Sequence, residues 1–472
     1  MGALMQVRFT RFACCLAVSA LTVSAAAGPT QTEDRTPQQQ APAQSLSLDE
    51  ARLIARSALY AGEFDVAREL AMGLLQADPE DAYAYGVLAA AHSRLNNPGL
   101  ARAAARLSYK YSDTPTEKFA AARTAASVAV QQKRVTRGQA WLRLAAVHAE
   151  TETQERQVRA DYARARAANP LNFNLSLSVA PSDNVNNGTD NTLLVINGIP
   201  SAARFSSATQ TLSGVVSTAD LRLRYRLNRT ANSVTHATGR AYTRQVALTD
   251  SAPGVDGSDF SSSYAEIGLS HRFALGAEGN TASVAGSLGT LWSGGETSFD
   301  FAKLELGRSL KLNDANRLSF KAAVEDRNSA IEPVRDAAVV TLSGTLAHKR
   351  PDGGRFTFGV TVQDVTSDQI NAEFQTATAR LAYTFAKSLG PARVTTGVTL
   401  GSTDYEDYTL IGPVDGGRED TSVYADVSLF FEDFSFAGFA PTVTLRTGQR
   451  TSNINRFDIS ESTLSIGLQS KF

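Results

Sequence analysis

Residues 171–472 alternate between apolar and polar side chains almost throughout, and this alternation constrains the fold more than any other feature of the chain. Leu221 and Leu223, for example, are interleaved with Arg222 and Arg224. Because successive side chains of a strand point to opposite faces, each run predicts a strand with one apolar and one polar face. Either a sandwich or a membrane barrel would satisfy this pattern.

Strand length and connection length favour the barrel. Most runs reach the roughly ten residues that a tilted strand needs to cross a bilayer, whereas sandwich strands are typically nearer five or six. Short and long connections also alternate along the segment, as they do in outer-membrane barrels. We therefore predict fourteen antiparallel strands, which begin near Asn172, Thr209, Ser233, Phe260, Thr281, Phe299, Arg317, Val334, Arg355, Ala372, Ala392, Thr421, Thr442 and Asp458.

The last strand is predicted to close the barrel. Leu464, Ile466, Leu468 and Phe472 share one face of an extended strand. An exposed aromatic edge of this kind would invite aggregation, and pairing with the first strand removes the edge. We expect the partner to be the strand that begins near Asn172. A terminal Phe also resembles the ends of many bacterial outer-membrane barrels.

The polar face of these strands is expected to line the lumen, because a charge facing lipid near the bilayer midplane would cost a few kcal/mol. This lining is either a solvated, ion-paired surface without a specific substrate or a surface that selects cargo. The charged candidates are Arg222, Arg224, Arg226, Lys303, Glu305, Lys321, Glu325, Arg380, Asp426 and Lys471.

The N-terminal residues indicate export from the cytoplasm. Residues 1–27 are predicted to be a signal peptide, in which two arginines precede an apolar stretch too short to span a membrane. The only cysteines, Cys14 and Cys15, lie in this segment, so the mature protein is expected to have no disulfide or thiol chemistry. Residues 28–47 are rich in proline and glutamine, which predicts a flexible linker.

Residues 48–170 are predicted to form a helical domain. Alanine, leucine and arginine recur at helical spacing, and Gly62–Ala67 aligns with Asn96–Ala101 at a distance of 34 residues. This pattern resembles the tetratricopeptide repeat, whose stacked helix pairs usually hold peptides or partner proteins. A spacer or a barrel plug is the alternative. Trp141 and Leu142 are expected to lie in the core.

The sequence carries no recognisable catalytic or metal-binding motif. The five histidines are scattered, and no P-loop, zinc-protease or serine-hydrolase motif is present. Residues 183–188 are similar to a calcium loop, but Val185 and Leu194 stand where ligands are needed. We therefore predict no catalytic residue, no cofactor and no metal. The formal charge of −1 gives no indication of a nucleic-acid partner.

The whole arrangement resembles the surface lipoprotein assembly modifier family, which joins a signal peptide and short tetratricopeptide-like domain to a fourteen-stranded barrel. The first predicted strand, Phe173–Asn186, ends in an Asp-Asn-x-Asn signature similar to that family's entry strand. Gly438–Pro441 and Arg450–Ile454 are similar to its C-terminal region. The resemblance implies movement of lipoproteins, or of soluble secreted proteins, across the outer membrane.

We therefore expect an outer-membrane translocon, not an enzyme, whose helical domain engages cargo or a chaperone in the periplasm. Its expected partners are outer-membrane lipid, a cargo lipoprotein or secreted protein, a periplasmic chaperone and the barrel assembly machinery, and we expect a monomer. An exopolysaccharide export porin is an alternative, although such porins usually carry many more repeats. A diffusion porin would leave the helical domain unexplained, and a barrel enzyme would lack a site.

Overall fold

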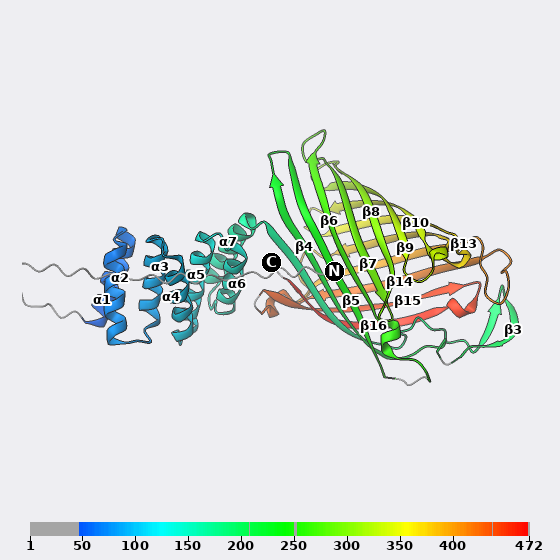
Figure 1. Cartoon of the computed structure of the whole chain (residues 1–472), viewed down its shortest axis with the longest axis horizontal. Coiled ribbons are helices and arrows are strands. Elements are labelled where there is room, and N and C mark those ends of the chain that lie inside the picture. The colour runs from blue at the N-terminus through cyan, green and yellow to red at the C-terminus, as the bar shows by residue number, and fades with distance from the viewer. Residues whose placement is uncertain (1–46, 207, 250–252, 437, 471–472) are drawn as a thin grey trace, which may run out of the picture. The chain divides into compact units, whose positions relative to one another are not determined.

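The computed structural model describes residues 47–206, 208–249, 253–436 and 438–470. The predicted signal peptide lies outside these ranges, as do nearly all of the predicted linker and the C-terminal residues Lys471 and Phe472. Within them, seven α-helices are followed by a closed antiparallel barrel of fourteen strands (Figure 1). The predicted fold class, a helical repeat segment followed by a fourteen-stranded barrel, is therefore confirmed.

The helices form antiparallel pairs whose ends carry ordinary capping signals. Thr114 and Thr151 each begin a helix with a capping box, in which the threonine hydroxyl accepts from a backbone N–H three residues later. Proline occupies the first turn of two helices, where its missing N–H costs nothing. The helices are α1 (Leu48–Ala61), α2 (Phe64–Ala77), α3 (Ala82–Arg94), α4 (Pro98–Tyr111), α5 (Pro115–Gln131), α6 (Val135–Val147) and α7 (Glu152–Ala168).

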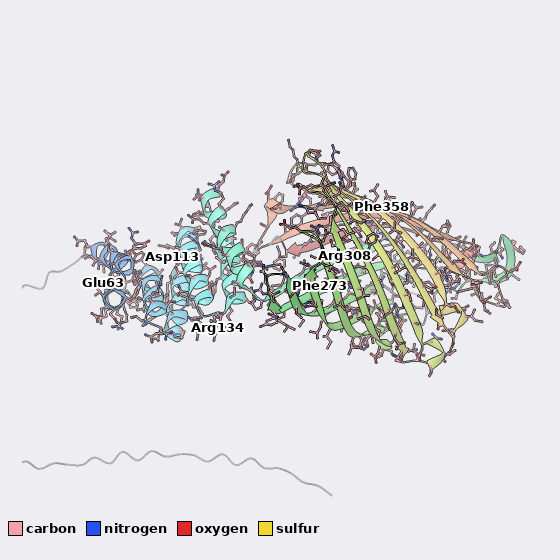
Figure 2. All side chains as sticks on the ribbon, turned by 90° about the horizontal axis from the view of Figure 1, so that it is seen from above. Glu63, Asp113, Arg134, Phe273, Arg308 and Phe358 are labelled. Carbon is pink, nitrogen blue, oxygen red and sulfur yellow. The ribbon has the colours of Figure 1, made fainter. Side chains whose placement is uncertain are left out.

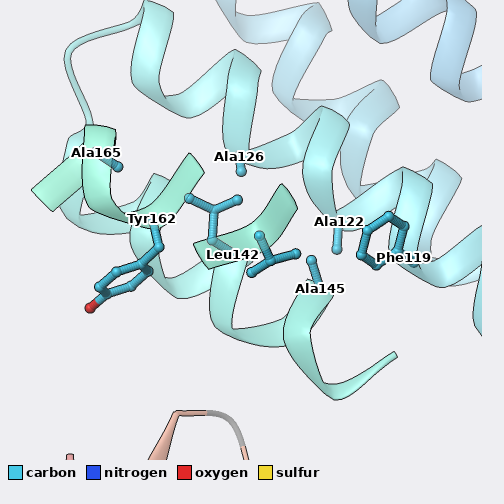
Figure 3. Packing of buried hydrophobic residues seen from close by; sticks show 8 residues of the cluster. Phe119, Ala122, Ala126, Leu142, Ala145, Tyr162 and Ala165 are labelled. Atoms are coloured by element: carbon cyan, nitrogen blue, oxygen red, sulfur yellow. The ribbon is translucent and has the colours of Figure 1, made fainter. Parts of the chain in front are cut away.

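Small residues allow these helices to pack closely. The core cluster between α5, α6 and α7 combines four alanines with Phe119, Leu142, Val158 and Tyr162 (Figure 3). Two further clusters between the earlier helices consist largely of alanine. Close approach of small residues is what stacked helical repeats require. Within the described ranges, no helix is both long and apolar enough to cross a membrane.

The barrel follows almost directly, with β1 beginning three residues after α7 ends. The domain boundary that the sequence predicts between residues 170 and 171 stays a prediction. The barrel strands are β1 (Leu171–Ser182), β4 (Gly214–Arg229), β5 (Ser233–Leu248), β6 (Ser262–Ala274), β7 (Thr281–Ser293), β8 (Glu296–Lys311), β9 (Asn316–Ser329), β10 (Ala337–Lys349), β11 (Arg355–Ser367), β12 (Phe374–Thr384), β13 (Arg393–Tyr405), β14 (Arg418–Phe430), β15 (Phe439–Ser452) and β16 (Ile459–Ser470).

Each barrel strand pairs with its neighbour in sequence, and β1 pairs with both β4 and β16, which closes the cylinder. The predicted starting points lie within three residues of the observed ones, except that β4 begins at Gly214 rather than at Thr209. The alternation of the sequence therefore corresponds to real strand register. Phe358 of β11, labelled in Figure 2, is one of the exposed apolar side chains of the barrel strands.

The long connection between β1 and β4 contains two strands that the sequence analysis missed. β2 (Leu193–Ile196) and β3 (Ile199–Arg204) form a separate hairpin outside the barrel sheet. Asn197 and Gly198 make its turn, and both have positive φ, at 50° and 77°. A two-residue turn with two positive φ angles matches the twist of a hairpin, and Asn-Gly is its favoured sequence.

Candidate functional site

The helical part contains a strongly basic cavity of about 290 Å³ between α4, α5 and α6. Small apolar side chains of α5 form part of its wall. Among the described residues, no acidic side chain lines it. The remaining lining includes four arginines and one aromatic residue, namely Arg102, Arg106, Arg134, Arg137 and Trp141. Arg134 is labelled in Figure 2 beside the start of α6.

Helical spacing brings these guanidinium groups together. Arg102 and Arg106 are one turn apart on α4, so they share a face of that helix. Arg134 immediately precedes α6, and Arg137 lies in its first turn. Trp141, one turn further on, packs edge-on against Tyr109 with ring centroids 5.3 Å apart.

These arginines lack the carboxylate partners that other arginines of the repeats possess. Arg52 pairs with Asp81 at 2.9 Å, and Arg123 pairs with Asp161 at 2.8 Å. By contrast, no carboxylate in the described part of the chain lies within ion-pair distance of any of the four cavity arginines. Arg102 instead donates to the side-chain oxygen of Gln132 at 2.6 Å. The cavity therefore presents several positive charges that an anion could pair with.

These arginines were not among the residues predicted from the sequence to be functional. Trp141 and Leu142 were expected in the core, and Leu142 is indeed buried. Trp141 is half-buried, since it packs against two core clusters on one side and lines the cavity on the other. The available signal was the pairing of arginines at helical spacing on two successive helices, with an aromatic residue one turn away.

Most of the charged candidates in the barrel form ion pairs, either within one strand, between neighbouring strands or between strands two apart. Lys303 pairs with Glu266 at 2.9 Å, Lys321 with Glu305 at 2.8 Å, and Arg327 with Glu325 at 2.7 Å. These side chains lie on the face opposite to exposed apolar residues such as Leu304 and Leu306. A surface that pairs its own charges in this way favours a solvated lining over a single substrate site.

The pair between Arg380 and Asp426 spans three strands. Arg380 Nη1 of β12 donates to Asp426 Oδ1 of β14 at 2.6 Å. It passes Gly397 of β13, where an added Cβ would overlap the guanidinium. Side chains two strands apart approach each other on the concave side of a curved sheet, so we infer that this pair faces the barrel interior. The missing side chain of Gly397 is what leaves room for it.

The three predicted lumen arginines of β4 differ from one another. Arg222 pairs with Asp220 at 2.9 Å, and Asp220 also accepts from Arg240. Arg224 forms no ion pair with any described carboxylate. Arg226 donates to the backbone carbonyls of Ala167 and Ala168 at 3.3 and 3.2 Å. These carbonyls belong to the last turn of α7, where a cation is stabilising.

The terminal strand follows the predicted register. Leu464, Ile466 and Leu468 are exposed on one face of β16, and Ile466 and Leu468 lie opposite Val179 and Leu177 of β1. Phe472 lies outside the described residues, so its part in the closure stays a prediction.

Asparagine side chains organise the loop that follows β1. Asn184 accepts from the Gly188 N–H and donates to the Gly188 carbonyl, both at 2.8 Å. Asn186 donates to the Gln210 carbonyl at 2.7 Å and accepts from the Leu212 N–H at 3.0 Å. In this loop, asparagines of the calcium-like motif therefore bond to the chain itself. Among the described residues, no group of three or more possible ligands is placed to hold a metal ion.

The β2–β3 hairpin is bonded to the connection between β15 and β16. The Val195 N–H donates to Asn455 Oδ1 at 2.8 Å, and Asn455 Nδ2 donates to the Leu193 carbonyl at 2.9 Å. The Asn197 N–H donates to the Asn453 carbonyl at 2.8 Å. The hairpin in the loop after β1 and the turn before β16 thus lie side by side.

A buried charged group supports the same end of the barrel. Arg418 has a side chain only 8% exposed and donates from Nε to Asp420 at 3.0 Å. Its guanidinium lies over the rings of Tyr405, Tyr408 and Phe457. An adjacent apolar cluster joins Leu194 of the hairpin to Tyr408, Val414 and Ile454.

The barrel sequence has a family assignment. The family model described as "Surface lipoprotein assembly modifier" matches residues 171–472, which is more than half of the chain. The chain belongs to this family. No curated protein sequence matches it. Family membership and the closed fourteen-stranded barrel together support an outer-membrane location and a general role in surface lipoprotein assembly.

Solved structures resemble the two parts of the chain separately. The TPR2B domain of yeast Sti1 in its pHsp70 complex is 20% identical, covering 25% of this chain and 96% of that chain, with a TM-score of 0.23. The Yersinia enterocolitica translocator chaperone SycD is 15% identical, covering 26% and 88%, with a TM-score of 0.23. A BenF-like porin from Pseudomonas fluorescens Pf-5 is 11% identical, covering 64% and 98%, with a TM-score of 0.36. TM-scores this low support no inference about the ligands or partners of this chain.

Proposed function

We propose that this protein exports lipoproteins, or soluble secreted proteins, across the outer membrane and displays them at the cell surface. The helical part lies in the periplasm and engages the cargo or a chaperone that delivers it. The barrel supplies the passage, and transport proceeds by binding and release without covalent chemistry. The observation that carries this proposal is the match of the whole barrel to the surface lipoprotein assembly modifier family.

The basic cavity between α4, α5 and α6 supports a role for the helical part in binding an acidic segment of a protein. Arginine pairs with carboxylates through two parallel hydrogen bonds, and four guanidinium groups around one cavity, none with a described carboxylate partner, favour such a ligand. Trp141 adds an aromatic surface on which an extended peptide can pack. A chaperone or cargo segment rich in Asp and Glu is therefore the partner that this chemistry fits.

Surface labelling of intact cells tests the proposal. The gene for this chain is deleted in its own organism, and each epitope-tagged lipoprotein is labelled with an antibody that cannot enter the cell. We expect at least one lipoprotein to lose its surface signal while its total amount is unchanged, and a plasmid copy of the gene to restore the signal. Unchanged labelling of every lipoprotein and secreted protein would contradict the proposal.

The role of the cavity is tested in the complemented strain. Arg106→Gln with Arg137→Gln removes two of the four cavity charges and is expected to lower surface display about tenfold. The matched control replaces Arg156 and Arg159, which are exposed on α7 and pair locally with Glu152 and Glu155. This control should display cargo normally. Equal display by both variants, at equal amounts of heat-modifiable barrel, would exclude the cavity as the docking site.

A further inference from the structure

Within the described residues, which end at Ser470, the ladder that closes the barrel is much shorter than any other in the sheet. Among the described residues, β1 pairs with β16 over four residue pairs, from Ser176 with Gln469 to Val179 with Ile466. The same strand pairs with β4 over all twelve of its residues. Every other pair of neighbouring barrel strands is joined over ten or more residue pairs.

The ladder stops at the end of the strands that carries the long β1–β4 loop. Extending its register would place Ala180 opposite Ser465 and Pro181 opposite Leu464, but neither pair forms. Pro181 has no N–H to donate, which removes one ladder bond from this edge. In the described structure, Thr463–Ser465 of β16 has no β1 partner and Ile459–Ser462 lies beyond the end of β1, although β16 is fully paired with β15. Unpaired strand edges are usually avoided or covered in native proteins.

The hairpin and Asn455 hold the two sides of this seam together where the ladder does not. β2 and β3 belong to the loop that leaves β1, and Asn455 belongs to the turn that enters β16. The contact between them consists of hydrogen bonds to the Asn455 side chain, one isolated bridge between Ile196 and Ile454, and the apolar packing of Leu194 against Ile454. Such a contact can be released without disturbing any barrel strand, because the hairpin forms a sheet of its own.

An acylated protein carries lipid chains that a polar barrel lumen does not stabilise. An opening in the side of the barrel would let these chains stay in the bilayer. Acyl chains are stabilised in the bilayer by about 0.8 kcal/mol for each buried CH₂ group. The polar face of this barrel carries ion pairs such as Arg380 with Asp426, and it offers no comparable apolar environment. The lipid anchor is therefore better accommodated if it stays in the membrane while the polypeptide crosses. That route requires the wall to part at one place.

We propose that the β1–β16 seam opens laterally to pass the acylated end of a lipoprotein into the bilayer, and that the β2–β3 hairpin with Asn455 is its latch. The inference rests on the proposed export function. The occupant is the diacylated or triacylated N-terminal segment of the cargo, whose extended backbone pairs with the free edge of β16 while its acyl chains contact lipid.

Disulfide locking tests the seam. The lock introduces cysteines at Ser176 and Gln469, and a second version introduces them at Leu177 and Leu468. Adjacent antiparallel pairs alternate between closer and wider spacing, so one of the two versions offers the shorter Cβ separation that a disulfide needs. The control lock joins β10 to β11 through Ser343 and Thr361, or through Leu342 and Val362. The only native cysteines lie in the predicted signal peptide.

The experiment measures surface display of the lipoprotein that depends on this chain. It also measures export of a version of that cargo whose acylated cysteine is replaced by alanine. We expect the seam lock to lower display of the acylated cargo at least tenfold, and a reductant to restore it. The control lock should have no effect, and the non-acylated version should still reach the exterior through a locked seam.

Three results would overturn the inference: normal display of acylated cargo through a fully oxidised seam, equal loss with the control lock, or equal loss of both cargo versions. The first result leaves the proposed function intact, because the unlocked protein still supports display. Failure of the proposed function itself would appear earlier, as unchanged display after the gene is deleted.

Asn455→Ala separately tests the latch, and we expect it to increase the rate at which the reduced seam cysteines react with a membrane-impermeant thiol reagent. An unchanged rate would exclude Asn455 as the latch.

Discussion

The guanidinium carbon of Arg418 lies 3.4 Å from the centre of the Phe457 ring. The same group pairs with Asp420, whose side chain is only 4% exposed. Arg418→Ala would leave the Asp420 carboxylate buried, with Arg450 at 3.8 Å as its nearest remaining cation. Breaking a buried pair by removing one partner typically costs about 3–5 kcal/mol. We expect a loss of this order in the free energy of unfolding, measured by guanidinium titration in detergent.

An exposed pair provides the control for this measurement. Arg393 lies 3.1 Å from Glu432, and their side chains are 48% and 37% exposed. Arg393→Ala should change the free energy of unfolding by less than about 1 kcal/mol, because water screens such pairs. A similar loss of unfolding free energy in the two variants would show that the buried pair stabilises the barrel no more than the exposed pair does.

The pair between Arg380 and Asp426 should be energetically coupled through the space above Gly397. A double-mutant cycle with Arg380→Gln and Asp426→Asn is expected to give a coupling of about 1–3 kcal/mol, the range for hydrogen bonds between charged groups. Gly397→Ala places a methyl group where the guanidinium lies, so the same cycle in that background should give a coupling near zero. An unchanged coupling would mean that Arg380 reaches Asp426 by another path.

Gly138 is expected to be required for the packing of α6 against α5. A Cβ at this position would lie 2.6 Å from Cγ2 of Val130 and 3.3 Å from the Ala126 carbonyl. Overpacking of this kind typically costs about 1–3 kcal/mol. Gly138→Ala should therefore lower the unfolding midpoint of the helices, followed by their far-ultraviolet circular dichroism. Adding Val130→Ala removes the clashing methyl group and should recover part of the loss, whereas simple additivity of the two changes would contradict the packing argument.

Burial lowers the pKa of His92, and the positive charge of Arg68 lowers it further. The unfolded imidazole, with a pKa near 6.5, therefore takes up a proton before the folded one does. The free energy of unfolding of the helices should be constant above about pH 7 and should decrease as the pH falls through the unfolded value. His92→Gln should flatten this decrease between pH 7.5 and 5.5, as measured by chemical unfolding. A parallel decrease in the variant would assign the effect to other groups.

The barrel could be predicted from the sequence because its strands obey a local rule. The alternation around Leu221 and Arg222 reports the two faces directly, and each turn between strands interrupts it. The ion-pair partners of the charged residues could not be predicted in this way, because Arg380 and Asp426 are brought together by the closure of the sheet over a third strand. No pattern within either strand specifies that contact.

The hairpin between β1 and β4 was missed for a different reason. Its turn, Asn197-Gly198, is the strongest short hairpin signal in the segment, but the apolar run before it, Leu193–Ile196, is only four residues long. Its docking on Asn455 depends on residues 260 positions away, which no local signal reveals. The same applies to the basic cavity, where Arg102 and Arg137 come from two helices that meet only after the repeats have stacked.

The docking of the hairpin on Asn455 also imposes an order on biogenesis. The hairpin belongs to the first long connection of the barrel to be synthesised, but its binding site is completed only with the turn before the final strand. Closing a loop of this length is slow relative to forming any neighbouring strand pair. The hairpin therefore stays undocked, and accessible to protease, while the intervening strands assemble. Its acquisition of resistance to an external protease would thus mark the moment at which a newly made barrel becomes complete.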